Sequence, residues 1–178
     1  NAGTTNSLRV LGKKAGAIVL FCDIIKTGLA MTAVRLLFRE QYGEILYLLA
    51  FYAAAGAILG HNFPFYMNFK GGKGIAATAG VLASLDWRLT LICLVIFVGS
   101  VALTRYVSLG SILVAAAFFA VNLIFSWKGM YGLTPFARVV EFWGVAGAVS
   151  AMAIWRHRAN IKRLLAGNEN KLWGNKKV

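Results

Sequence analysis

The chain has 178 residues, of which 59% are hydrophobic and only 14% charged, and its mean hydropathy is +0.68. Water-soluble domains of this length do not normally carry so much apolar sequence, so the composition argues against a soluble domain and indicates an integral membrane protein. The formal net charge of +13 raises nucleic acid as a partner, but the sequence lacks a basic and aromatic surface module, so we expect no nucleic acid partner.

Five apolar runs approach the roughly 20 residues that a transmembrane helix needs. In chain order they cover residues 15–38, 45–60, 89–104, 107–127 and 136–155. A further run, 74–85, is apolar but would be only about 18 Å long as a helix, well short of the roughly 30 Å hydrocarbon core. We expect a short or tilted span or a re-entrant segment there, followed by an interfacial turn at Asp86, Trp87 and Arg88. The predicted fold is an all-α integral membrane protein, a polytopic helical bundle with about six visible transmembrane helices.

The loops predict the orientation of these spans. If residues 1–14 are cytoplasmic, six crossings place residues 61–73, 104–106 and 156–178 on the same side. These segments carry most of the Lys and Arg residues, so the positive-inside rule predicts that they face the cytoplasm. We expect residues 1–178 to form a single membrane-embedded domain, with residues 156–178 as a cytoplasmic juxtamembrane tail.

The chain opens with a cluster of small polar residues, Asn1-Ala2-Gly3-Thr4-Thr5-Asn6-Ser7-Leu8-Arg9. Such residues expose backbone N–H groups and supply short donors, while Arg9 offers a bidentate fork to a phosphate. The alternative interpretation is a helix cap followed by a solvated loop.

A second cluster, Lys70-Gly71-Gly72-Lys73-Gly74, opens the short apolar run. Glycines let backbone N–H groups converge on an anion, and a following helix N-terminus adds partial positive charge, so the cluster predicts a phosphate site. It is not a Walker A loop, because Gly74 follows Lys73 where a Ser or Thr would hold Mg²⁺. The alternative is a flexible interfacial turn with snorkelling lysines.

A third cluster follows the last span, where His157 and Asn160 are three residues apart in a basic segment. On a continuing helix the two side chains share a face, while Ile161, Leu164 and Leu165 form an apolar stripe that predicts a helix along the membrane surface. The alternative, a basic anchor that only sets topology, does not need His157 or Asn160.

Three polar residues lie near or within the first spans. Asp23 and Lys26 are one turn apart inside the first run, where ionisable groups normally pair and face the bundle interior. His61 is a candidate ligand or base. With two His in the chain and no cysteine beside them, we expect no metal site.

Taken in order, the motifs resemble the bacterial acyl-phosphate:glycerol-3-phosphate acyltransferase (PlsY) family over nearly the whole chain. The matching patterns are N-x-G-x-T-N-x-x-R, G-H-x-x-P with F-K-G-G-K-G, Y-V-S-L-x-S and R-H-x-x-N-I-x-R-L-x-x-G-x-E. The resemblance implies a seven-span inner-membrane enzyme that moves a fatty acyl group from acyl phosphate to glycerol 3-phosphate, giving lysophosphatidic acid and phosphate without a cofactor. It also implies a soluble partner enzyme that supplies acyl phosphate. In the family the first motif begins Gly-Ser-Gly ahead of the position of Asn1, and a first span lies further upstream.

The resemblance carries over by position to twelve residues: Asn1, Gly3, Thr5, Asn6 and Arg9 in the first motif, Gly71, Gly72, Lys73 and Gly74 in the second, and His157, Asn160 and Glu169 in the third. We predict that Arg9 and Lys73 hold phosphate and that the glycine amides cradle a second phosphate. His157 and Asn160 are predicted to orient glycerol 3-phosphate, with His61 and Glu169 as further substrate-binding residues.

The competing hypothesis is a transporter or channel for phosphorylated solutes, since glycine loops and half-helix ends also serve anion passage. A transporter would usually contain a repeat relating two halves. The sequence shows none, which favours the enzyme.

Overall fold

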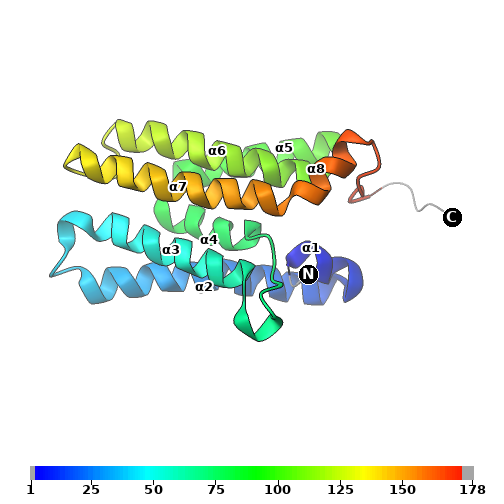
Figure 1. The fold of residues 1–178 in the computed structure, drawn as a ribbon, viewed down its shortest axis with the longest axis horizontal. Helices are drawn as coiled ribbons and strands as arrows, with labels where there is room; N and C mark the ends of the chain where they lie inside the picture. Colours follow the sequence, from blue (N-terminus) through cyan, green and yellow to red (C-terminus); the bar gives the residue numbers. More distant parts are fainter. Residues whose placement is uncertain (1–2, 174–178) are drawn as a thin grey trace.

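The computed structural model describes residues 3–173, so the predicted site residue Asn1 lies outside the described residues. Within that range the chain is helical and contains no strand, which confirms the predicted all-α class. The helices of Figure 1 are α1 (Thr4–Val10), α2 (Gly12–Phe38), α3 (Leu46–Asn62), α4 (Ile75–Leu85), α5 (Trp87–Thr104), α6 (Val107–Trp127), α7 (Phe136–Arg156) and α8 (Arg158–Leu165). Single 3₁₀ turns, Gly43–Ile45 and Phe65–Met67, flank α3.

Five segments of the described chain are long and apolar enough to cross a membrane. They are α2, the segment Gly43–Met67 that contains α3, and the helices α5, α6 and α7. They match the five predicted runs, and the chain is a multi-pass helical membrane protein.

The short sixth run is α4, with 11 residues. A Cβ on Gly74, just before α4, would meet the side chains of Ile58 and Asn62 at 3.0–3.1 Å, so α4 begins beside the last turns of α3. At its other end the Leu85 carbonyl accepts a hydrogen bond from the Tyr47 hydroxyl (3.5 Å), near the start of α3. This helix therefore runs antiparallel to α3 along most of its length, and it is shorter than the five segments that are long enough to cross a membrane.

The predicted interfacial turn between α4 and α5 is a single residue. Asp86 has an extended backbone, and its Oδ1 accepts a hydrogen bond from the Arg88 amide at 2.8 Å. An Asp in this position satisfies an amide at the start of a helix, which lets α5 begin at Trp87 instead of after Arg88.

The helices pack as two groups (Figure 1). The helix α2 packs on α1, α3 and α4, and α6 packs on α5 and α7, while contacts of α4 with α5 and of α3 with α7 join the groups. A Cβ on Gly80 of α4 would lie 2.2 Å from the Ile24 carbonyl oxygen, so only glycine lets α2 and α4 approach this closely. Phe51, Phe118 and Phe142 fill the junction of α3, α6 and α7 and are fully buried.

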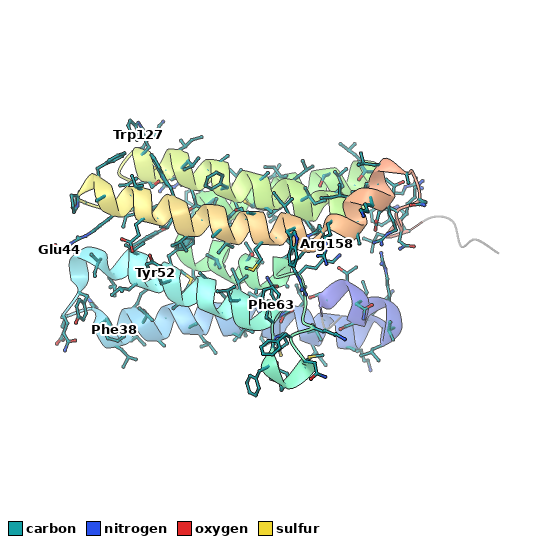
Figure 2. The ribbon with its side chains drawn as sticks, viewed as in Figure 1. Phe38, Glu44, Tyr52, Phe63, Trp127 and Arg158 are labelled. Carbon is teal, nitrogen blue, oxygen red and sulfur yellow. The ribbon has the colours of Figure 1, made fainter. Side chains whose placement is uncertain are left out.

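Large apolar side chains cover the outside of the bundle, as expected for a surface that faces lipid. In Figure 2, Phe38, Glu44 and Trp127 lie toward one end of the bundle, and Phe63 and Arg158 lie toward the other. All three polar motifs are at this second end, where α1, the loop between α3 and α4, and α8 come together (Figure 1).

The third motif departs from the predicted continuous helix. The Ala153 carbonyl accepts a hydrogen bond from the His157 side chain, and the His157 amide turns to the Ile154 carbonyl at 2.9 Å. The side chain thus takes the carbonyl that a continuing α-helix would use, and α7 ends before His157 while α8 starts after it.

Candidate active site

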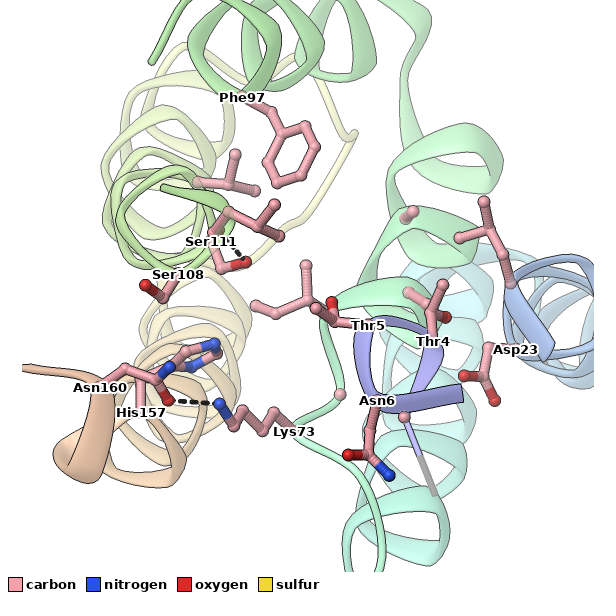
Figure 3. Close-up of a pocket in the computed structure, with 18 of the residues that line it drawn as sticks. Thr4, Thr5, Asn6, Asp23, Lys73, Phe97, Ser108, Ser111, His157 and Asn160 are labelled. Carbon is pink, nitrogen blue, oxygen red and sulfur yellow. Dashed lines mark hydrogen bonds between the residues drawn. The ribbon is translucent and has the colours of Figure 1, made fainter. Parts of the chain in front are cut away.

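A cavity of about 440 Å³ lies at the polar end of the bundle (Figure 3). It receives residues from all three motifs: Gly3, Thr4, Thr5, Asn6, Arg9, Lys73, Gly74, His157, Asn160, Arg163 and Glu169. His61 and Asp23 also line it. The sequence therefore identified most of the polar wall, and the structure adds Thr4, Asp23 and Arg163.

Lys73 crosses the cavity to the third motif. Its ammonium donates to Asn160 Oδ1 (Figure 3), Asn160 Nδ2 donates to Glu169 Oε1 at 3.1 Å, and Glu169 Oε2 accepts from Arg163 at 2.9 Å. Asn160 and Glu169 are buried. These hydrogen bonds fix the direction of the Asn160 amide, because Glu169 accepts from its Nδ2 and so leaves its Oδ1 toward Lys73.

Lys73 sits among further cations. Burial lowers the pKa of Lys73 below its ordinary value; Glu169 opposes this shift, and Arg163, Arg9 and Arg156 add to it. A desolvated ammonium beside several guanidinium groups is poorly neutralised by protein carboxylates. An anion such as phosphate would relieve that repulsion.

His157 is 3% exposed, and its Nδ1 lies 2.8 Å from the Ala153 carbonyl oxygen. Because a carbonyl oxygen can only accept, Nδ1 carries the proton and Nε2 is left as an acceptor. Burial lowers the pKa of His157 to about 4, and the nearby Lys73 acts in the same direction. The imidazole is therefore neutral at physiological pH and offers a lone pair.

The predicted cradle of glycine amides is wrong for Gly71 and Gly72. The Gly71 amide donates to the Asn62 carbonyl (3.2 Å) and the Gly72 amide to the His61 carbonyl (3.1 Å), and neither glycine lines the cavity. Glycine is required there for close packing, since a Cβ at either position would lie 2.0 Å from an atom of His61. Gly74 does line the cavity, with a positive φ of 84° that starts α4. The first amides of a helix have no intrahelical acceptor, so those of α4 are candidate backbone donors for an anion.

Arg156 holds the glycine loop from the opposite side. Its guanidinium donates to the Gly71 carbonyl at 2.8 Å and to the Gly72 carbonyl at 2.6 and 3.1 Å, and it lies over the Phe63 ring. Arg156 is the first residue of the R-H-x-x-N pattern, but its contact with the glycine loop was not predictable from the sequence.

The first motif is mainly helical, since α1 begins directly after Gly3. In Figure 3 this helix carries Thr4, Thr5 and Asn6 on the side of the cavity opposite His157 and Asn160. Arg9, in its last turn, is exposed and lines the cavity. The structure thus brings Arg9 and Lys73 to one cavity from two separate elements.

The expected ion pair of Asp23 and Lys26 is present, with Lys26 Nζ 2.6 Å from Asp23 Oδ1. His61 joins it, with Nδ1 3.1 Å from the same carboxylate oxygen.

The cavity has an apolar arm that sequence analysis did not identify. It runs between α4, α5 and α6 and is lined by Ile75, Ala79, Leu82, Leu94, Phe97 and Val114. Ser108 and Ser111, from the Y-V-S-L-x-S pattern, stand where the arm meets the polar end, and Ser108 Oγ has no hydrogen-bond partner among residues 3–173. In uniformly apolar helices nothing in the pattern separates cavity-lining from lipid-facing residues.

The fold and this cavity define a polytopic helical membrane protein with a cationic cavity open to an apolar arm. Residues 1–167 match the family model described as Glycerol-3-phosphate acyltransferase, and the chain belongs to that family.

Individual relatives agree with this placement. The chain is 44% identical to the glycerol-3-phosphate acyltransferase of Halalkalibacterium halodurans, over 99% of this chain and 80% of that protein. It is 40% identical to that of Clostridioides difficile, over the same shares. Among solved structures it is similar to PlsY (YgiH), an integral membrane glycerol 3-phosphate acyltransferase. The glycerol 3-phosphate form gives a TM-score of 0.77 at 32% identity, covering 97% of this chain and 78% of that one. The lysophosphatidic acid form gives 0.73 at 31% identity, covering 95% and 78%.

Proposed function

We propose that this chain transfers a fatty acyl group from acyl phosphate to glycerol 3-phosphate, with lysophosphatidic acid and inorganic phosphate as products. The observation that carries the proposal is the cavity, which joins clustered cations for phosphate to an apolar arm for an acyl chain. Family membership supports the acyltransferase activity. The related structures named for glycerol 3-phosphate and lysophosphatidic acid support the acceptor and the product.

The donor is already activated, so the reaction needs position and charge more than a protein nucleophile. The hydroxyl oxygen of glycerol 3-phosphate attacks the acyl carbon, the bond from that carbon to the phosphate oxygen breaks, and phosphate leaves with the electron pair. Cys93 is the one thiol that lines the cavity among residues 3–173, and it lies buried in the apolar arm, where a thiolate is disfavoured. A covalent acyl-enzyme is not required.

Lys73 and Arg9 bind substrate phosphate, and the N-terminal amides of α4 add donors beside them. Asn160, held by Glu169, and the free Nε2 of His157 orient the attacking hydroxyl. With a pKa of about 4, His157 is a weaker base than a phosphate monoester, whose second pKa is about 6. The hydroxyl proton therefore passes to a substrate phosphate oxygen, while His157 accepts the hydrogen bond that aims the hydroxyl.

The same proposal includes the membrane location of the chain and the source of its acyl phosphate. The single domain lies in the bacterial inner membrane with its motif end toward the cytoplasm, as the excess of Lys and Arg at that end supports. Acyl phosphate then arrives from a soluble enzyme on the cytoplasmic side.

The test is direct. Detergent-purified protein is incubated with glycerol 3-phosphate and one of two donors, acyl phosphate in one reaction and acyl-CoA in the other, and lysophosphatidic acid is measured. We expect the acyl phosphate reaction to give product and the acyl-CoA reaction to give none. The Lys73→Ala variant should give no product with either donor. Product from acyl-CoA at a similar rate would refute the donor, and no product from either donor would refute the acyltransferase.

A further inference from the structure

Asp23, Lys26 and His61 form a polar cluster between α2 and α3. Lys26 Nζ lies 2.6 Å from Asp23 Oδ1 and 2.7 Å from His61 Nδ1. The side chains of Asp23 and His61 are only 8% and 6% exposed, and that of Lys26 is 40% exposed. Burying charged groups within a membrane bundle costs free energy, so a cluster of this kind indicates a functional role.

The cluster fixes the orientation of the His61 ring. His61 Nδ1 lies 2.7 Å from the Lys26 ammonium and 3.1 Å from Asp23 Oδ1, so this edge of the ring has a polar partner in either tautomer, the ammonium as donor or the carboxylate as acceptor. Asp23 in turn holds the ammonium in place. The opposite edge of the ring, with Nε2, is thereby directed away from the cluster.

That opposite edge lies against the glycine loop. A Cβ on Gly72 would be 2.0 Å from His61 Nε2, and the Gly72 amide donates to the His61 carbonyl at 3.1 Å. From the other side Arg156 binds the Gly72 carbonyl at 2.6 Å. Gly72 is thus held between α3 and α7, and the next residue, Lys73, projects to Asn160.

We propose that Asp23, Lys26 and His61 are positioning residues, which press the His61 imidazole against Gly72 so that Lys73 is presented to Asn160. The inference rests on the proposed acyl transfer and adds a membrane-embedded support to its phosphate site. Lys26 does not line the catalytic cavity; it lines a second cavity, of about 410 Å³, on the far side of Asp23 and His61. It therefore acts through His61 and not on a substrate.

The clash at Gly72 supplies a specific test. Gly72→Ala should push against the ring and displace Lys73, and a misplacement of about 1 Å reduces kcat/KM on the order of a hundredfold. His61→Ala removes the ring, so Gly72→Ala should add little in that background. If His61 bound substrate directly, the fold losses of kcat/KM in Gly72→Ala and His61→Ala would multiply in the double variant. That outcome would overturn the proposal. Gly56→Ala is the matched control, because Gly56 lies on α3 like His61 and a Cβ there would have nothing within 4 Å. This variant should retain activity.

Lys26→Met gives a second, independent arm. It removes the ammonium that lies 2.7 Å from His61 Nδ1, and Lys26 does not line the catalytic cavity. It should lower kcat/KM in the otherwise unchanged protein and have no further effect in His61→Ala. An equal additional loss in His61→Ala would show that Lys26 does not act through the ring, and would overturn the proposal.

The position of residue 73 can also be measured without turnover. Lys73→Cys is placed in protein lacking its free cysteines, Cys22 and Cys93, and its reaction with a water-soluble thiol reagent is timed. Gly72→Ala should change the rate several-fold, and His61→Ala should cancel that change; an unchanged rate in Gly72→Ala refutes the positioning role. Because this measurement needs no catalysis, it stands even if the unmodified protein makes no lysophosphatidic acid, a result that would defeat the proposed function alone.

Discussion

Asn160→Ala removes the group that binds Lys73 to the third motif. Asn160 accepts a hydrogen bond from Lys73 and donates one to Glu169, and it is buried. Without it, the Glu169 carboxylate keeps Arg163 but loses its amide donor, and Lys73 loses the acceptor that directs it into the cavity.

The size of the effect follows from these contacts. A hydrogen bond to a charged group contributes roughly 1.5–3 kcal/mol. If that contribution is realised in the transition state, its loss reduces kcat/KM by roughly ten- to a hundredfold. Both partners of Asn160 are charged, so we expect the upper part of that range when glycerol 3-phosphate is the varied substrate.

Arg158→Ala is the matched control, because it removes a charge from the same helix. Arg158 lies over the Trp155 ring, with its guanidinium carbon 4.3 Å from the ring centroid, and it bonds the Trp155 carbonyl at 3.3 Å. It does not line the cavity. Steady-state kinetics of both variants, with thermal unfolding to confirm folding, should show a large loss for Asn160→Ala and a mild one for Arg158→Ala. A larger loss for Arg158→Ala would support the basic anchor and refute the role given to Asn160.

Three further results are expected. Lys73→Ala should abolish turnover but leave membrane insertion intact, and near-normal turnover would exclude Lys73 as the phosphate ligand. Cysteines placed at Lys70 and at Asn170, both exposed, should be labelled by an impermeant thiol reagent only from the cytoplasmic side, and outside labelling of either would overturn the orientation. The pKa of His157 is lowered from 6.5 to about 4, so the unfolded chain binds the proton more readily. Stability should fall as the pH drops from 6.5 to 4, by roughly 3 kcal/mol, and His157→Gln should flatten that part of the thermal-unfolding profile against pH.

The sequence predicted the features that depend on chain-local patterns. Apolar runs of sufficient length predicted the crossings. Because an even number of predicted crossings separates one motif from the next, the three motifs were expected at the same end of the bundle. Asp23 and Lys26 were recognisable as a pair because they are one turn apart. The placement of His61 beside them was not predictable, since it depends on how α3 packs against α2. The apolar arm was hidden for a related reason: Phe97 and its lipid-facing neighbours have the same composition, and only packing decides which of them face the cavity.

The glycine loop shows how a segment can be predicted to reach the cavity for an incorrect physical reason. Lys70-Gly71-Gly72-Lys73-Gly74 reads as a phosphate loop whose amides bind the anion, yet the Gly71 and Gly72 amides are bonded to carbonyls of α3. Their lack of side chains allows the loop to lie between His61 and Arg156. Loss of activity on substituting either glycine would therefore reflect geometry, whereas loss on substituting Lys73 reflects charge. Under the proposed function, phosphate affinity in this cavity depends on cations contributed by separate elements, Arg9 from α1, Lys73 from the loop before α4 and Arg163 from α8, and it requires these elements to be held together at one end of the bundle.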